Sequence, residues 1–301
     1  METISAHEAT VGWRVWVMGA RPATLPASIA PVLVGTAAGV HDGAFALLPF
    51  LSALMAAVLI QVGANLANDL FDFEKGADTS QRLGPPRITQ SGLASPQQVR
   101  LAMILSFGVA TLIGLYLISV GGWPILLIGV FSIAAGIAYT GGPWPLGYHG
   151  LGDLFVFIFF GLVAVMGSAY LQTSVLSLTA FAAALPVGCP VTALLVVNNL
   201  RDIETDQRAD KRTLAVRLGA PLTRAQYTLL LLLPYVLVTG FVARGVFPQA
   251  CWLVWLTLPL AASLIRTVVH GAEGRALNAV LKGTGQLHLL FSLVLAGGLI
   301  L

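Results

Sequence analysis

Two clusters of acidic and amide side chains hold most of the carboxylates in this chain. Eight of its 13 Asp and Glu residues lie in these clusters or just after them. The first cluster contains Asn65, Asn68, Asp69 and Asp72, and the second contains Asn198, Asn199, Asp202 and Asp206. Each follows a long apolar stretch. Carboxylate and amide oxygens, with no Cys and no nearby His, are ligands for a hard cation, so the pattern favours Mg²⁺ over Zn²⁺.

Helical spacing predicts which of these side chains can converge. The first four stand at i, i+3, i+4 and i+7, which is one face of a helix. In a continuous helix the second set would also share a face, whereas Glu204 would point to the opposite side. Carboxylates about 4 Å apart repel by roughly 4 kcal/mol at an effective dielectric of 20, so they need a cation between them. We therefore expect a metal-binding catalytic set, supported by amide oxygens: Asp69, Asp72, Asp202 and Asp206, with Asn65, Asn68 and Asn199 beside them.

Basic residues follow each cluster. Lys75, Arg82 and Arg87 come after the first, and Lys211 and Arg212 come after the second. Carboxylates, a divalent cation and cationic side chains together suit a diphosphate, whose oxygens they bind and whose departure they assist. The plainer interpretation of the basic residues is membrane topology, because cytoplasmic loops of membrane proteins are rich in Lys and Arg.

The composition is that of an integral membrane protein. Hydrophobic residues make up 57% of the chain, charged residues make up 10%, and the mean hydropathy is +0.86. Apolar stretches long enough to cross the bilayer as helices lie near 23–41, 45–67, 101–121, 124–141, 154–177, 179–200, 226–243, 247–265 and 284–301. We predict an all-α polytopic membrane protein with nine transmembrane helices around a central cavity, forming one domain over residues 1–301.

The positions of the positive charges predict the orientation. Nine helices with a cytoplasmic N-terminus place every Lys and Arg except Arg244 on the cytoplasmic side. Both acidic clusters then face the cytoplasm at the cell membrane. The interval from Asp69 to Asp202 is almost the same as that from Asp72 to Asp206, which indicates two related halves. A net charge of +3, with bases next to acids, does not favour a nucleic-acid partner.

A Gly- and Pro-rich segment from 141 to 152 is a further candidate for binding. Tyr139 and Asp153 stand at its edges, on the same predicted side as the clusters. The segment could cap a cavity or orient a substrate. A plain turn between helices explains it equally well.

The two clusters match the motifs of a known family. Residues 68–72 fit the start of an Asn-Asp-x-x-Asp-x-x-x-Asp motif, and residues 202–206 fit an Asp-x-x-x-Asp motif. The chain thus resembles the UbiA superfamily of intramembrane aromatic prenyltransferases. The last Asp of the first motif is replaced by Gly76, and Asp78 follows two residues later.

Weaker similarities extend along the chain. The stretches 21–26, 82–92, 139–143, 150–153, 211–217 and 281–288 are similar to the 1,4-dihydroxy-2-naphthoate polyprenyltransferases of that superfamily. The resemblance implies Mg²⁺-assisted ionisation of a polyprenyl diphosphate within the lipid bilayer. It also implies attack by an aromatic acid acceptor with loss of CO₂, giving a demethylmenaquinone in menaquinone biosynthesis.

Two alternatives remain open at this point. One is a related enzyme with another acceptor, such as 4-hydroxybenzoate, because the same ionising site serves many acceptors. The other is an ion-coupled membrane transporter, which also uses intramembrane acids and repeated halves. A transporter would be expected to hold its acids near the middle of the bilayer, whereas these acids lie at the ends of the apolar stretches.

Overall fold

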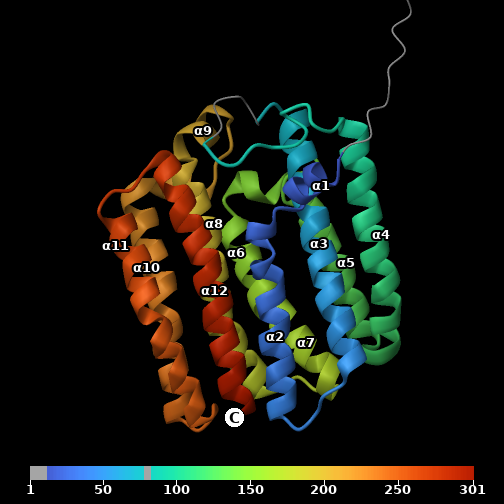
Figure 1. Cartoon of the computed structure of the whole chain (residues 1–301), viewed down its shortest axis with the longest axis vertical. Helices are drawn as coiled ribbons and strands as arrows, with labels where there is room; N and C mark the ends of the chain where they lie inside the picture. Colours follow the sequence, from blue (N-terminus) through green and yellow to red (C-terminus); the bar gives the residue numbers. More distant parts are fainter. Residues whose placement is uncertain (1–11, 78–82) are drawn as a thin grey trace, which may run out of the picture.

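The computed structural model describes residues 12–77 and 83–301, and all regular secondary structure in these ranges is helical. The long helices stand side by side along one axis (Figure 1). The predicted all-α fold is therefore confirmed. Arg82 and Asp78, two residues of interest in the sequence, lie outside the described residues.

The described first half of the chain supplies four long helices, α2 to α5, after a short entry segment. Its elements are α1 (Trp13–Ala20), η1 (Pro22–Thr24), α2 (Pro26–His41), α3 (Leu47–Glu74), α4 (Pro96–Gly121), α5 (Trp123–Ala138) and η2 (Leu146–His149). The next segment is one apolar span in three parts: α6 (Gly152–Val156), the π-helix η3 (Phe157–Val163) and α7 (Ala164–Thr173).

The second half contains the most buried helix of the protein, α8 (Leu178–Arg201). It is followed by α9 (Ile203–Arg208), α10 (Leu214–Ala243), η4 (Gln249–Thr257), α11 (Leu258–Val269), η5 (Gly274–Ala276) and α12 (Leu277–Ile300). Buried side chains of α8, α10 and α12 form one continuous hydrophobic core.

Seven helical segments in the described ranges are long and apolar enough to cross a membrane. An eighth arises if Trp13–Thr24 and Pro26–His41, which meet at 55°, count as one bent span. The remaining predicted span corresponds to α5, which has 16 residues. At about 1.5 Å per residue it is shorter than the roughly 30 Å of a hydrocarbon core. The count of nine spans therefore stays a prediction.

The bend at the start of the chain brings polar groups to α3. Arg21 adopts a left-handed conformation with φ 52°, and Pro22 and Pro26 begin the two helices that follow. Proline fits the first turn of a helix because its missing N–H would have no partner there. Arg21 Nη2 then donates a hydrogen bond to the carbonyl of Asn65, at 3.1 Å.

Close backbone contact fixes the π-helix against α8. A Cβ atom on Gly161 would lie only 2.7 Å from the Cα of Gly188, so glycine is required at this crossing. Phe159 and Phe160 of the same π-helix line the internal cavity described below. The crossing therefore positions an aromatic part of the cavity wall.

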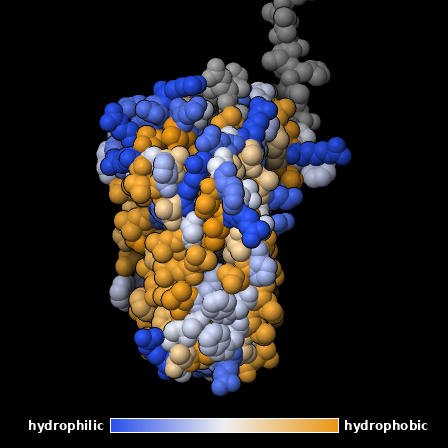
Figure 2. Space-filling model, turned by 90° about the vertical axis from the view of Figure 1, so that its left-hand side faces the viewer, coloured by the Kyte–Doolittle hydropathy of each residue, from blue (hydrophilic) through white to orange (hydrophobic). Residues whose placement is uncertain are grey.

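The molecule has one strongly polar end. α1, α9 and the α3–α4 connection gather there (Figure 1), and Figure 2 shows hydrophilic residues concentrated at this end above a broad hydrophobic surface. Both acidic clusters are at the ends of helices that reach it, α3 and α8. This distribution is that of a multi-pass membrane protein with its ionisable groups near one membrane face.

Candidate active site

A cavity of about 830 Å³ lies between the two halves of the helical bundle. Its head, at the polar end, is lined by residues from both clusters and by nearby bases: Asn65, Asn68, Asp72, Arg87, Asn198, Asn199 and Lys211. Its body is lined mainly by apolar residues of α3, α4, α5, η3 and α7. The cavity therefore has the shape and polarity for an amphiphile with an anionic head and a long apolar tail.

Two helix glycines widen the apolar body. Gly114 of α4 and Gly129 of α5 both line the cavity, and a Cβ atom on either would meet no heavy atom within 4 Å. Glycine inside a helix costs about 0.5–1 kcal/mol relative to alanine. Neither glycine is needed for packing, so their effect is to leave room in the cavity.

In the first cluster, Asp69 holds the backbone of the α3–α4 connection. Its Oδ2 accepts a hydrogen bond from the N–H of Ile88 (3.1 Å), and its Oδ1 accepts one from the N–H of Thr89 (3.0 Å). Its side chain is almost completely buried, and Arg21 Nη2 lies 4.0 Å from Oδ2. This carboxylate therefore anchors the connection that carries Arg87.

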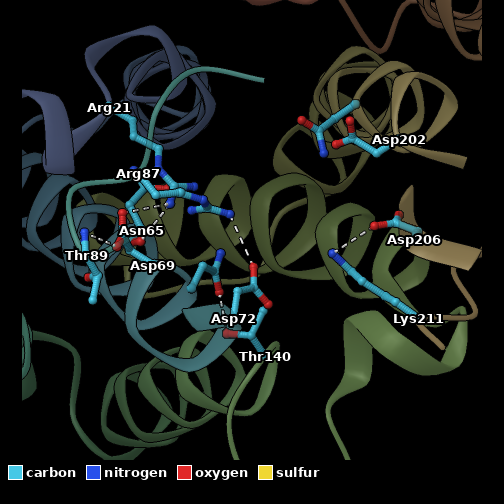
Figure 3. A network of polar contacts seen from close by, with 12 residues as sticks. Arg21, Asn65, Asp69, Asp72, Arg87, Thr89, Thr140, Asp202, Asp206 and Lys211 are labelled. Atoms are coloured by element: carbon cyan, nitrogen blue, oxygen red, sulfur yellow. Dashed lines mark hydrogen bonds and ion pairs between the residues drawn. The ribbon is translucent and has the colours of Figure 1, made fainter. Parts of the chain in front are cut away.

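Asp72 lies one turn further along α3 and lines the cavity head. Its Oδ2 is 3.2 Å from Nη2 of Arg87, and its Oδ1 accepts a hydrogen bond from the hydroxyl of Tyr148 at 2.9 Å. Asp72 is thus the carboxylate that the first cluster presents to the cavity, and Figure 3 shows its ion pair with Arg87.

The two asparagines of the first cluster, Asn65 and Asn68, form hydrogen bonds with different parts of the protein. Asn65 Nδ2 donates to the carbonyl of Ala20 and to Oγ1 of Thr24, both at 2.9 Å, and so holds the bend between α1 and α2. Asn68 Oδ1 accepts a hydrogen bond from Thr140. Both asparagines also line the cavity, and the bond with Thr140 ties Asn68 to the segment after α5.

The second cluster is not one continuous helix, so the prediction of a shared helical face over residues 198–206 was wrong. α8 ends at Arg201, and Asp202 has φ −100° and ψ 8° between α8 and α9. The turn gives Asp202 and Asp206 separate surroundings. The prediction that Glu204 points away is confirmed, because its side chain is 85% exposed.

Asp202 forms a two-pronged ion pair with the preceding residue. Arg201 Nε donates to Oδ1 at 2.8 Å, and Arg201 Nη2 donates to Oδ2 at 2.6 Å. The same guanidinium donates to Asn198 and to Asn278 of α12, and Asn278 in turn donates to the carbonyl of Leu83. Asp202 therefore belongs to a network that joins α8, α12 and the α3–α4 connection.

Asp206 lies on α9, beyond the membrane-spanning helices. Its Oδ1 is 3.6 Å from Nζ of Lys211, which points toward the space between the two clusters (Figure 3). Its Oδ2 is buried and has no hydrogen-bond partner within the described ranges. The pKa of Asp206 is raised to about 6 by burial; Lys211 opposes this shift, while the charges of Asp202 and Asp72 add to it.

The other predicted binding residues lie around this head. Asn199 is buried and lines it, and Tyr139 lines the cavity from the end of α5. Lys75 donates hydrogen bonds to the carbonyls of Thr140 and Gly142. Asp153 is buried at the start of α6, where it accepts a hydrogen bond from Gln226 at 2.7 Å, and it does not line the cavity.

Arg212 points outward rather than into the head. It pairs with Asp210 at 3.2 Å, and its side chain is 71% exposed. Its backbone N–H, in contrast, donates to the carbonyl of Tyr148 at 3.0 Å. The geometry therefore favours Lys211 over Arg212 for contact with a ligand in the cavity.

Arg201 and Tyr148 are among the residues of the site that the motif spacing does not indicate. Arg201 was counted only as a cytoplasmic positive charge, although its position directly before Asp202 was a usable signal. Tyr148 lies within the Gly- and Pro-rich segment, 76 residues from the Asp72 that it contacts. Nothing in the spacing of the clusters pointed to it.

The cavity head has the donors that a hard divalent cation needs. Within the described ranges no three His, Cys, Asp or Glu side chains are close enough to form a complete metal cluster. Mg²⁺ in proteins commonly uses one or two carboxylates together with phosphate oxygens of the substrate. Asp72 lines the head, and Asp206 lies beside it, paired with Lys211 and with an unsatisfied Oδ2, so one carboxylate from each cluster fits that requirement.

The fold and site define a multi-pass helical membrane protein with one cavity that has a charged head and an apolar body. The model of the UbiA prenyltransferase family matches residues 28–291, so the chain belongs to this family. The chain is 43% identical to the 1,4-dihydroxy-2-naphthoate octaprenyltransferase of Mycobacterium tuberculosis over 94% of its own length and 96% of that protein. It is 37% identical to the protein of the same name from Escherichia coli, with 96% of each chain covered.

Solved structures of the family share the fold. A UbiA homolog from Archaeoglobus fulgidus bound to GPP and Mg²⁺ matches with a TM-score of 0.64 and 16% identity, covering 95% of this chain and 99% of that one. A UbiA homolog from Aeropyrum pernix matches with a TM-score of 0.69 and 17% identity, covering 91% and 96%. A further Archaeoglobus fulgidus structure was determined with Cd²⁺. Metal ions and a prenyl diphosphate are therefore found in proteins of this fold.

Proposed function

We propose that this protein transfers a polyprenyl group from a polyprenyl diphosphate to 1,4-dihydroxy-2-naphthoate. The products are diphosphate, CO₂ and a demethylmenaquinol, the hydroquinone form of a demethylmenaquinone, in menaquinone biosynthesis. The observation that carries the proposal is the cavity itself: Asp72, Arg87 and Lys211 line its head, Asp206 pairs with Lys211 beside it, and an apolar body extends from it into the bundle. The relatives named for this reaction, which match nearly the full chain, support the choice of acceptor.

The residues of the head act on the donor. Asp72 and Asp206, assisted by Asn68 and Asn199, are the groups that we expect to hold Mg²⁺, with Asp69 and Asp202 behind them as anchors. Bound Mg²⁺ supplies positive charge that favours departure of the diphosphate. Arg87 and Lys211 add fixed positive charge at the same end, where negative charge develops on the leaving group.

The apolar body acts on the reactive carbon. Cleavage of the allylic C–O bond leaves a carbocation, which the electron-rich naphthalene ring attacks at the carbon that bears the carboxylate. Loss of CO₂ returns the electron pair of the broken C–C bond to the ring and restores aromaticity. The walls of α3, α4, α5 and η3 exclude water, which would otherwise capture the cation.

A direct assay tests this function and its nearest rival. Membranes that contain the protein are incubated with a polyprenyl diphosphate and either 1,4-dihydroxy-2-naphthoate or 4-hydroxybenzoate, with Mg²⁺ or with EDTA. We expect a prenylated and decarboxylated naphthalene product that requires Mg²⁺. Product formed only from 4-hydroxybenzoate would replace the proposed acceptor, and uptake of a substrate without any chemical change would favour a transporter.

We also propose that the cavity head faces the cytoplasm at the cell membrane. The basic residues support this orientation, because Arg244, which follows α10, is at the opposite end of the bundle from the clusters. Cysteines introduced as Ser91→Cys and Arg244→Cys test it, since the two native cysteines are buried. In intact cells a membrane-impermeant thiol reagent should label only the Arg244→Cys variant. Labelling of the Ser91→Cys variant alone would mean that the cavity head faces the outside of the cell.

A further inference from the structure

Tyr148 stands at the joint between the two halves of the cavity head. It lies in η2, within the segment that links α5 to α6. Its hydroxyl donates a hydrogen bond to Oδ1 of Asp72, at 2.9 Å, and Nζ of Lys211 lies over its ring, 5.4 Å from the centroid. One side chain thus contacts a carboxylate from the first half and a cation from the second.

The backbone around Tyr148 is fastened to both halves. Its carbonyl accepts a hydrogen bond from the N–H of Arg212, in the segment after α9. From the other side, Lys75 at the end of α3 donates to the carbonyls of Thr140 and Gly142, and its Nζ lies 5.1 Å from the ring centroid of Tyr148. The position of the ring is therefore determined by contacts from α3 and from the segment after α9 together.

The hydroxyl and the ring of Tyr148 constrain different groups, Asp72 and Lys211. A hydroxyl donor on Oδ1 fixes the rotation of the Asp72 carboxylate, while Arg87 contacts Oδ2. An aromatic face attracts an ammonium group through its quadrupole, so the ring holds Lys211 near the cavity rather than free in solvent. Asp72 and Lys211 both line the cavity head, whereas Tyr148 does not.

We infer that Tyr148 is a positioning residue, which holds Asp72 and Lys211 in register across the head and so sets the affinity of the site for diphosphate. This inference rests on the proposed function, since it assumes that the head receives the diphosphate of the donor. Tyr148 itself makes no chemical step. Its effect on a ligand passes through the carboxylate and the ammonium group that it contacts.

Two substitutions separate the hydroxyl contact with Asp72 from the ring contacts with Lys211 and Lys75. Tyr148→Phe removes the hydroxyl and keeps the ring, and Tyr148→Leu removes both. Tyr235→Phe is the matched control, because it removes a buried tyrosine hydroxyl that bonds to Thr257 at 2.7 Å, far from the cavity head. The melting temperature of each purified variant in detergent shows whether it is folded.

The decisive measurement is the binding of inorganic diphosphate in the presence of Mg²⁺, by calorimetry, without donor or acceptor. We expect Tyr148→Leu to weaken binding roughly tenfold or more and Tyr148→Phe by about threefold, because Tyr148 acts through Asp72 and Lys211 and only part of the strength of each contact reaches the ligand. In turnover assays the KM for the polyprenyl diphosphate should rise in the same order. The KM for the acceptor should stay within about twofold.

Three results would overturn the inference. One is wild-type affinity for diphosphate in Tyr148→Leu. Another is an equal rise in the KM for the polyprenyl diphosphate and the KM for the acceptor in the Tyr148 variants, which would indicate a general loss of structure. The third is a loss of diphosphate affinity in Tyr235→Phe equal to that in the Tyr148 variants. If the wild type bound no diphosphate, the proposed function would fail together with the inference, whereas wild-type binding that Tyr148→Leu leaves unchanged removes the inference alone.

Discussion

Each of the two acidic clusters has one carboxylate bound tightly by the protein and one paired with a cation, but the binding partners differ between the clusters. In each, one carboxylate has both of its oxygens bound by a single neighbouring segment: Asp69 by two backbone N–H groups of the α3–α4 connection, and Asp202 by the guanidinium of Arg201. In each, a second carboxylate faces a cation beside the cavity: Asp72 with Arg87, and Asp206 with Lys211. We call the first pair the anchoring carboxylates and the second pair the presenting carboxylates.

The comparison shows that four acidic residues in motif spacing need not be equivalent ligands. Asp69 anchors the α3–α4 connection, which carries Arg87, and Asp202 joins α8 to α12 through Arg201, so each anchor holds a structural element beside the head. We propose that, when substrate binds, the presenting carboxylates pair with a metal ion, while their cationic partners, Arg87 and Lys211, pair with the diphosphate. Substitutions in each pair test the division into anchoring and presenting carboxylates.

Loss of charge at a presenting carboxylate should have the largest effect. Asp72→Asn keeps an oxygen that can accept the hydrogen bond from Tyr148 but removes the negative charge at the cavity head. We expect kcat/KM to fall by about 10²–10³-fold, the scale of losing one preorganised electrostatic contact in an active site. The assay with polyprenyl diphosphate and the naphthoate acceptor measures this. Asp42→Asn, at the far end of α2, is the control and should retain full activity.

Removing the partner of an anchoring carboxylate should lower stability. Arg201→Met leaves Asp202 with an uncompensated charge in a side chain that is only 15% exposed, and it also ends the bonds to Asn198 and Asn278. Breaking a buried ion pair in this way costs about 3 kcal/mol or more. Thermal unfolding in detergent should show a clear fall in melting temperature. Arg208→Met, whose exposed pair with Glu204 contributes little, is the matched control.

The other anchor should show a smaller loss. Asp69→Ala leaves the N–H groups of Ile88 and Thr89 without their acceptor, in a part of the connection where both residues are buried. Unsatisfied buried donors cost about 1–3 kcal/mol each, and partial rearrangement of the connection would reduce the total to about 2 kcal/mol. The same unfolding measurement tests this value. Unchanged stability together with a complete loss of Mg²⁺-dependent diphosphate binding would instead make Asp69 a direct ligand.

The sequence predicted the helical class, the shared polar end and the residues of the first cluster because these depend on local periodicity. Residues 65–72 do lie on one helix, α3, as the spacing required. The same reasoning gave a wrong prediction for the second cluster, because α8 ends at Arg201. The end of a helix depends on tertiary contacts as well as on local preference. The contact of Tyr148 with Asp72 depends on how a loop folds back over α3, which no local pattern encodes.

The smallest effect is expected at the one acid of the second motif that belongs to neither pair. Glu204 lies between Asp202 and Asp206 in the sequence, but its side chain is 85% exposed, and its contact with Arg208 is a surface pair at 3.8 Å. Such a pair contributes about 0–1 kcal/mol, so Glu204→Gln should change neither kcat/KM nor the melting temperature measurably. Glu204→Gln could instead lose as much activity as we expect for Asp206→Asn. In that case the place of a residue in the motif would matter more for activity than the direction in which its side chain points. The division into anchoring and presenting carboxylates would then need to include Glu204.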